Sequence, residues 1–316
     1  MVSQSTNKTK NGIIYVIIAA VMWAFSGTIG QVLSQDMNFD PIWIVTVRIN
    51  ISGIILMIIS ITKHGKDVFK IFHNKKHLLQ LILFSLFGNG LMQLSYFFAI
   101  SASNAATATI LQYLSPVVII LAGIFISKKK PTKTEVICTM LAVIGTFLIG
   151  THGSINSLAL SSQALFWGLV GAVTLAFYSV YPVKLMKTYG NSVILAWSMV
   201  FAGLFLDVYS NPIGKYSSLS IDAVVNMSLL IIFGTVIAFS LYSKGVSRIG
   251  GGKANMLATI EPLSSAIISY FSFHTSFVIY DYIGFVCIIA ITLLLSLDGM
   301  NFKKTQKNDP HALAKG

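Results

Sequence analysis

One acidic residue stands inside an apolar stretch that is long enough to cross a membrane. The stretch covers residues 251–270, and Glu261 followed by Pro262 lies near its middle. A carboxylate inside a spanning helix is energetically expensive and therefore indicates a functional site. Proline removes a backbone hydrogen bond and kinks the helix, which is tolerated where neighbours or a cavity satisfy the freed carbonyl. The alternative is a kinked packing helix whose glutamate is ion-paired.

Two kinds of chemistry are open to Glu261. Burial in an apolar environment favours the neutral form of a carboxyl group, whereas a nearby cation favours the charged form. Glu261 could therefore take up and release a proton, or bind a cationic group of a solute. The rival role is a fixed ion pair with Arg48, the one basic residue that lies well away from the ends of a predicted span. We favour a functional role for Glu261 and a structural role for Arg48.

Uncharged polar and aromatic residues recur at spacings of three and four along other apolar stretches, which places them on one face of each predicted helix. Polar groups that face lipid would be unsatisfied, so these faces must point into the helix bundle. Interhelical hydrogen bonds explain any single residue, but the whole set indicates a wet cavity for a small amphipathic or aromatic solute. The candidate binding residues are Trp23, Ser26, Asn89, Gln93, Gln112, Tyr113, Tyr178, Asn255, Thr259 and Glu261, with Pro116 and Pro262 as candidate hinges.

The composition requires a membrane environment for these faces. The 316 residues are 55% hydrophobic and only 10% charged, whereas soluble domains carry roughly 25% charged residues. Apolar runs near the roughly 20 residues that a bilayer requires follow one another along the chain. They predict an all-α integral membrane protein with ten spans at about 12–34, 42–62, 78–100, 103–127, 132–150, 162–187, 190–209, 223–246, 252–273 and 278–298.

The basic residues predict the orientation of these spans. With both polar tails, 1–11 and 299–316, on the inner side, all but two of the 22 Lys and Arg residues lie on that side. The exceptions are Lys215 and Arg48. This bias is the positive-inside signal and requires an even number of spans. We therefore expect a multi-pass protein of the cell membrane with cytoplasmic termini, whose net charge of +12 faces anionic inner-leaflet lipid.

The sequence lacks the residues that several other classes of function require. Nucleic-acid binding would need a basic face on a soluble domain, and the spans leave no such domain. All six histidines fall in predicted loops or tails, and we find no Cys/His/Asp/Glu cluster at metal spacing. No Gly-rich phosphate loop of the Lys-Ser/Thr type occurs. We expect neither a metal nor another cofactor.

The chain contains an internal repeat. When the sequence is slid on itself by 146 residues, the third to fifth spans fall on the eighth to tenth, and a shift of 152 aligns the first with the sixth. The coincident residues include Phe87-Gly88 with Phe233-Gly234, Tyr96 with Tyr242, Pro116 with Pro262, and Phe25 with Phe177. We therefore expect two five-helix repeats, at 12–150 and 162–298.

An odd number of helices in each repeat makes the second copy enter from the opposite side of the membrane. Inverted repeats are typical of secondary transporters, which bind their substrate near the midplane between the repeats. Two copies of one fold can exchange conformations, so that one half opens while the other closes. The sequence thus favours a transporter.

At this point the chain resembles the drug/metabolite transporter superfamily, and within it the ten-helix proteins with two EamA domains. The resemblance covers residues 12–298 and rests on the helix layout and on two related segments, Ala-Thr-Ile-Leu-Gln-Tyr-Leu-Ser-Pro at 108–116 and Ala-Asn-Met-Leu-Ala-Thr-Ile-Glu-Pro at 254–262. Arg48, Gly145 and Gly284 add to it.

The chain departs from the family pattern after the fourth and ninth spans. The family often has a Gly-Glu pair there, and this chain has Lys128-Lys129 and His274-Thr275, which argues against close kinship with the best-marked members. The resemblance implies a central cavity lined by helices 1, 3, 4, 6, 8 and 9. It also implies export of amino acids, related metabolites or drugs.

Two other functions compete with solute export. An intramembrane enzyme or lipid-handling protein would need a nucleophile and a base together at depth, and no Ser/His or paired-Asp arrangement occurs within the spans. A receptor or assembly subunit would more often carry a large domain outside the membrane. The substrate, the coupling ion, with a proton as our expectation, and the oligomeric state, monomer or homodimer, stay open.

Overall fold

The molecule is a bundle of long helices. The computed structural model describes residues 2–128, 130–154, 159–210, 219–250, 254 and 257–307, and no strand occurs in these ranges. Eight of the described helical stretches are long and apolar enough to cross a membrane, and Ile279–Leu295 forms a shorter apolar one. The prediction of an all-α membrane protein is confirmed.

The first half runs from α1 to α7. Its elements are α1 (Val2–Gln31) with η1 (Val32–Asp36), α2 (Pro41–His64) with η2 (Gly65–His73), α3 (Lys75–Leu83) with η3 (Phe84–Gly90) and α4 (Leu91–Ala102), α5 (Ala105–Gln112), α6 (Ser115–Ser127) and α7 (Lys133–Thr151). The segments η1 and η3 are π-helical, and η2 is a 3-10 helix.

The second half runs from α8 to α15. Its elements are α8 (Ser162–Val180), α9 (Val183–Tyr189), α10 (Asn191–Ser210), α11 (Ile221–Ile231) with η4 (Ile232–Ile237) and α12 (Ala238–Ile249), α14 (Ile260–Phe273) and α15 (Ile279–Lys307). The segment η4 is π-helical. The predicted span at 252–273 is described from Leu257 onward and at Ala254.

Helices α1 and α15 extend into the predicted polar tails. Helix α1 begins at Val2, and α15 continues to Lys307. Hydropathy marks where the chain leaves lipid, but backbone hydrogen bonding continues because Lys and Gln are good helix formers. The spans predicted from hydropathy therefore end before the helices do.

Capping residues explain other helix starts. Before α2, the Asp40 side chain accepts a hydrogen bond from the Ile42 amide at 2.9 Å, and Pro41 occupies the first turn. Before α7, Thr132 and Glu135 form a reciprocal capping box. Such caps satisfy amide groups that have no partner within the helix.

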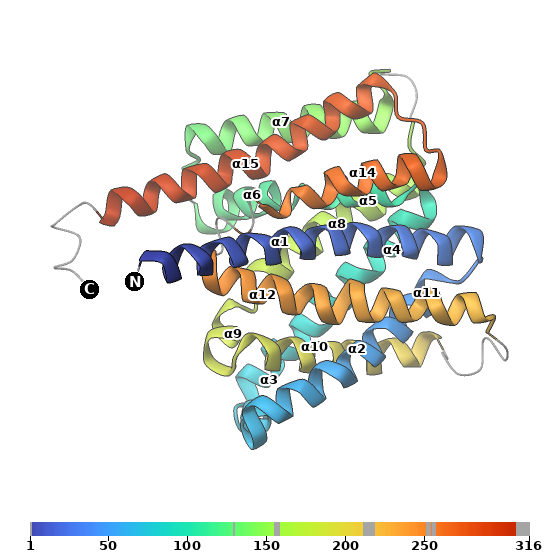
Figure 1. The fold of residues 1–316 in the computed structure, drawn as a ribbon. Helices are drawn as coiled ribbons and strands as arrows, with labels where there is room; N and C mark the ends of the chain where they lie inside the picture. The colour runs from blue at the N-terminus through green and yellow to red at the C-terminus, as the bar shows by residue number, and fades with distance from the viewer. Residues whose placement is uncertain are drawn as a thin grey trace.

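Helices from the two halves pack in pairs. Helix α2 packs along α10, α7 along α15, α1 along α12, and α4 along α8. In Figure 1, the pair α2–α10 and the pair α7–α15 lie at opposite sides of the bundle, with α1 and α12 between them. At the α7–α15 crossing, a Cβ atom on Gly284 would lie 2.9 Å from the Gly145 carbonyl oxygen. Glycine is therefore required where these backbones meet.

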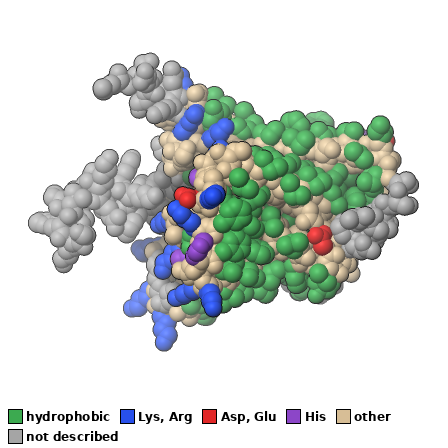
Figure 2. All heavy atoms as spheres, turned by 90° about the horizontal axis from the view of Figure 1, so that it is seen from below, with side chains coloured by type: hydrophobic (Ala, Val, Ile, Leu, Met, Phe, Trp, Pro, Cys, Tyr) green, Lys and Arg blue, Asp and Glu red, His purple; other side chains and the backbone are tan. Residues whose placement is uncertain are grey.

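The surface is divided into a basic end and an apolar belt. Figure 2 shows Lys and Arg gathered at one end, beside a wide region of hydrophobic side chains. The described part of α1 begins and that of α15 ends at this same end (Figure 1). Many large hydrophobic side chains of the described residues are exposed, and Phe125 and Ile126 are 77% and 82% exposed. Such a belt suits contact with lipid rather than with water.

Candidate functional site

Glu261 meets a tyrosine from the other half of the chain. The Tyr113 hydroxyl lies 3.0 Å from Glu261 Oε2 and 2.7 Å from the Ala258 carbonyl oxygen. Tyr113 lies in the turn between α5 and α6, and Glu261 in the first turn of α14. The two predicted binding residues are thus brought together across the repeats.

The chain turns just before each of the two candidate hinge prolines. Pro116 lies in the first turn of α6, after the turn at 113–114, and buried Pro262 follows a turn at Thr259. Each break exposes carbonyl groups that a regular helix would bond internally. Ala258, whose carbonyl accepts from Tyr113, directly precedes the second break. Thr259 is 8% exposed there, and Asn255 lies outside the described residues.

Trp23 forms an aromatic cluster on the α1–α12 interface. Its ring centroid lies 5.0 Å from that of Tyr242 and 5.2 Å from that of Phe239. The indole N–H of Trp23 is buried and has no hydrogen-bond partner in the structure. An indole N–H buried in this way usually finds a partner, so this donor is an unused polar group at the interface of the two helices.

Tyr242 is a central residue that the sequence analysis did not select. Besides contacting Trp23, it lies within electrostatic range of Glu261, Tyr113 and Tyr178. The shift of 146 residues, which places Tyr96 on Tyr242, is the sequence signal that could have identified it.

Tyr96 approaches the site from α4. Its hydroxyl is 2.8 Å from Thr109 Oγ1, and the ring packs so closely on α1 that a Cβ atom on Gly27 would lie 2.5 Å from that hydroxyl. Glu261 and Arg48 both lie within electrostatic range of Tyr96. Tyr96 therefore interacts electrostatically with both Glu261 and Arg48.

The predicted residues near η3 are largely engaged with protein. Asn89 donates to Ser198 Oγ of α10 at 2.8 Å and accepts from Gln93 Nε2 at 2.8 Å. Gln93 is 7% exposed, and its Oε1 atom is buried without a partner in the structure. The Tyr178 ring packs on Phe84, with centroids 5.4 Å apart. The buried Gln93 oxygen is thus an unused polar atom in this group.

Ser26 and Gln112 mark close approaches between helices. Ser26 is 4% exposed and lies directly against Gly234 of η4. The Gln112 side chain lies near Gly171 of α8, where an added Cβ atom would be 3.8 Å from Gln112 Cγ. The small residues opposite them allow α1 to approach η4 and α5 to approach α8.

Arg48 does not pair with Glu261 in this structure. The Arg48 Nε donates to Thr235 Oγ1 at 2.9 Å, and Nη2 donates to the Gly234 carbonyl at 3.3 Å. The guanidinium carbon lies 5.5 Å from the ring centroid of Phe97. Arg48 is 7% exposed, and no carboxylate of the described residues lies within ion-pair distance of it. Hydrogen bonds and a cation–π contact take the place of a counter-ion.

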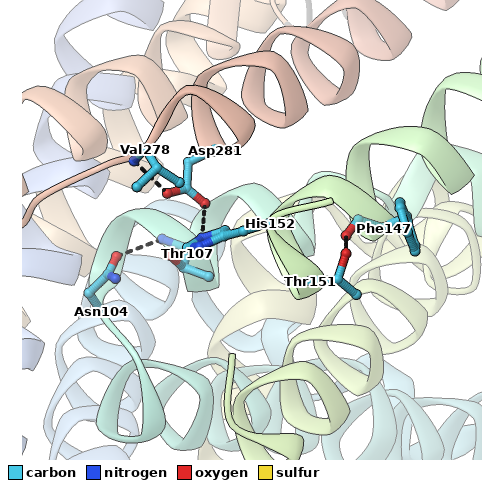
Figure 3. Close-up of polar contacts among 7 residues, drawn as sticks. All are labelled: Asn104, Thr107, Phe147, Thr151, His152, Val278 and Asp281. Carbon is cyan, nitrogen blue, oxygen red and sulfur yellow. Dashed lines mark hydrogen bonds and ion pairs between the residues drawn. The ribbon is translucent and has the colours of Figure 1, made fainter. Parts of the chain in front are cut away.

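A separate polar cluster ties the end of α7 to the start of α15. His152 Nε2 lies 3.0 Å from Asp281 Oδ1, and Asp281 Oδ2 accepts from the Val278 amide at 3.0 Å (Figure 3). His152 ends α7, and Asp281 lies in the first turn of α15. Nearby, Asn104 caps α5 by accepting from the Thr107 amide (Figure 3). This cluster joins helix ends rather than forming part of the central site.

Comparison with known proteins identifies relatives over nearly the whole chain. Residues 10–151 and 162–297 each match the family described as "EamA-like transporter family". A Salmonella typhimurium protein named "Uncharacterized inner membrane transporter YicL" is 38% identical over 290 residues, which cover 92% of this chain and 96% of that protein. A Bacillus subtilis protein named "Uncharacterized transporter YyaM" is 24% identical, covering 82% and 85%.

A solved structure shares the fold. It has a TM-score of 0.59 and covers 94% of this chain and 99% of its own, at 14% sequence identity. At that identity the likeness concerns the arrangement of helices alone.

Proposed function

This chain belongs to the EamA-like transporter family, and on that premise we propose that it is a secondary transporter that exports small organic solutes past Glu261. The family is one of membrane transporters, and the names of the relatives indicate a transporter rather than an enzyme. The direction, the substrates (amino acids, related metabolites or drugs) and the mechanism are our proposal. The observation that carries it is the contact of Tyr113 with Glu261 between two broken helices.

The helix breaks support alternating access between two repeats, 12–150 and 162–298. Transporters built of inverted repeats place their sites at discontinuous helices near the midplane. Here the breaks before Pro116 and Pro262 occupy equivalent positions and meet through Tyr113. Movement of one half against the other must therefore change the surroundings of Glu261.

The hydrogen bonds of Tyr113 support a proton-carrying role for Glu261. A hydroxyl has one proton to donate, yet both the Ala258 carbonyl and Glu261 Oε2 lie within reach of it. If Glu261 is protonated, it donates to the tyrosine oxygen, and the tyrosine donates to the carbonyl. If it is ionised, the two acceptors compete for one proton. The site can thus hold both forms, with different hydrogen bonds in each.

Flux across sealed membranes tests the proposal. Purified protein would first be screened against amino acids, amines and drugs by thermal shift, because specific binding raises apparent stability by mass action. Solutes that bind would then be loaded into proteoliposomes and their efflux measured with and without a proton gradient. Protein-dependent efflux supports transport. Binding without flux would indicate a receptor, and chemical conversion of the solute would indicate an enzyme.

The charge distribution supports an orientation with both termini in the cytoplasm of a cell membrane. A cysteine at Lys75, at the start of α3, should be protected from a membrane-impermeant thiol reagent on intact cells. A cysteine at Ser276, between α14 and α15, should react. The opposite pattern would invert the proposed topology.

A further inference from the structure

Two helices change to π-helical hydrogen bonding at equivalent places in the two repeats. The segment η3 covers Phe84–Gly90, and η4 covers Ile232–Ile237. The shift of 146 residues places Phe87-Gly88 on Phe233-Gly234, inside both segments. Single π turns inside α-helices are rare and are frequent at functional sites. The recurrence of a π segment at the same place in both repeats therefore indicates a functional role for the two segments.

Each π segment packs against the first helix of the opposite half. A Cβ atom on Gly234 would collide with Ser26 of α1. A Cβ atom on Gly88 would lie 3.5 Å from Phe177 of α8, besides colliding with Phe84 of its own helix. Phe177 aligns with Phe25, the neighbour of Ser26, when the sequence is shifted by 152 residues. The two contacts are thus related by the repeat.

Each π segment is also held by the second helix of the opposite half. Arg48 of α2 donates to the Gly234 carbonyl and to Thr235 Oγ1 in η4. In η3, Asn89 donates to Ser198 Oγ of α10. The two attachments occupy related places, but one is charged and the other is neutral.

The π segments precede a pair of equivalent tyrosines. Tyr96 follows η3 in α4, and Tyr242 follows η4 in α12. Because an α-helix has 3.6 residues per turn, one additional residue turns all later side chains by about 100° around the axis. The π segments therefore set the direction in which these tyrosines point. Both lie within electrostatic range of Glu261.

We propose that Tyr96 and Tyr242 line the solute path as a repeat-related pair, and that Arg48 is the positioning residue that holds Tyr242 there through η4. Asn89 and Ser198 have the corresponding role for Tyr96 through η3. The presence of a transported solute rests on the proposed function, whereas the positions of the side chains come from the structure alone. The experiments below therefore need no transported substrate.

The first experiment tests whether both tyrosines face a water-filled path. Tyr96→Cys and Tyr242→Cys would be made in a chain carrying Cys138→Ala and Cys287→Ala, and reconstituted in liposomes of neutral phospholipid. A charged methanethiosulfonate reagent added on both sides should modify both positions. Val286 of α15 is 66% exposed, so Val286→Cys is the lipid-facing control and should stay unmodified. Protection of both tyrosine positions, or equal modification at Val286→Cys, would overturn the proposal.

The second experiment tests the positioning role of Arg48. In Arg48→Gln, hydrogen–deuterium exchange of peptides covering 232–242 should rise several-fold, and exchange of 84–96 should stay unchanged. In Ser198→Ala the pattern should reverse. Arg48→Lys should restore part of the protection, because an ammonium group also donates to both acceptors. Equal changes in both segments would show a general loss of stability and would overturn the assignment.

A third variant keeps the test decisive if Arg48→Gln does not fold. Thr235→Val removes one acceptor in η4 and leaves the arginine in place. It should alter the modification rate of Tyr242→Cys and leave that of Tyr96→Cys unchanged. An unchanged rate at Tyr242→Cys would contradict the proposal. If this pattern holds but no solute crosses the membrane, the transport function fails and the positioning role stands.

Discussion

Helices α6 and α14 begin after similar breaks, but only α14 presents a carboxylate at its break. In the alignment of the repeats, Ser115 takes the place of Glu261, and Tyr113 takes the place of Thr259. A proline follows each break, so the backbone is interrupted in both halves. The ionisable group comes from one half and its hydroxyl partner from the other.

Both halves have the interrupted helix, whereas the carboxylate at the break is present in the second half alone. Interrupted helices in both halves are typical of transporters built of inverted repeats, and they agree with the alternating access that we propose. The carboxylate is not duplicated: Glu261 stands in the second half alone at this position, and its hydroxyl partner Tyr113 comes from the first half. The same division applies to η3 and η4, where the attachment is neutral in one copy and charged in the other.

The largest expected effect follows from making the two breaks chemically alike. Ser115 is 7% exposed, and Ser115→Glu would bury a second carboxylate there. A charged residue at the centre of a spanning helix costs about 3 kcal/mol on insertion scales. We expect a strong loss of thermal stability in detergent, with Ser115→Gln, of similar size and no charge, losing clearly less. Equal stability of the two variants would mean that the α6 break tolerates charge as well as the α14 break does.

An intermediate effect is expected when the contact between the breaks is removed. Tyr113→Phe leaves the Ala258 carbonyl and Glu261 without their shared hydroxyl. Hydrogen bonds between membrane helices contribute about 1 kcal/mol, so a modest fall in unfolding temperature is expected. Tyr178→Phe, which removes the same kind of hydroxyl from α8, is the matched control. A larger loss in the control would show that the Tyr113 contact does not join the halves.

The smallest effect on stability is expected at the prolines. Pro116→Ala and Pro262→Ala should each change the free energy of unfolding by less than about 1 kcal/mol, since removing proline changes mainly backbone freedom. Either change should slow transport, because a continuous helix resists bending at the break. Thermal melts and efflux rates measured on the same preparations check this prediction. Faster transport in either variant would remove the hinge role.

Hydropathy predicted much of the architecture. The spans, their order and the related segments at 108–116 and 254–262 can be read from the sequence because lipid requires long apolar helices. Hydropathy could not show that α5 ends before α6 begins, since a break inside a span leaves its mean hydropathy unchanged. It also could not show the helical tails, where polar residues continue the backbone hydrogen bonding.

The sequence predicts which residue types the candidate site contains, but not how these residues are arranged. Glu261 and Tyr113 were both selected, but nothing in a spacing of three or four fixes how one helix is rotated against another. The π segments add to this difficulty, because they turn the side chains that follow them. This explains why Tyr242 was not selected on helical periodicity. The pairing of Asn89 with Ser198 was also missed, because it joins helices far apart in the sequence.

The most direct test of the central claim is proton-driven efflux by Glu261→Gln in proteoliposomes. The matched control is Glu135→Gln, because Gln also serves at that position of the α7 capping box. We predict that Glu261→Gln keeps solute binding. The increase in efflux rate that a proton gradient produces should fall at least about tenfold, which corresponds to about 1.4 kcal/mol. The control should match the unmodified protein. Unchanged gradient-dependent efflux in Glu261→Gln would contradict the account.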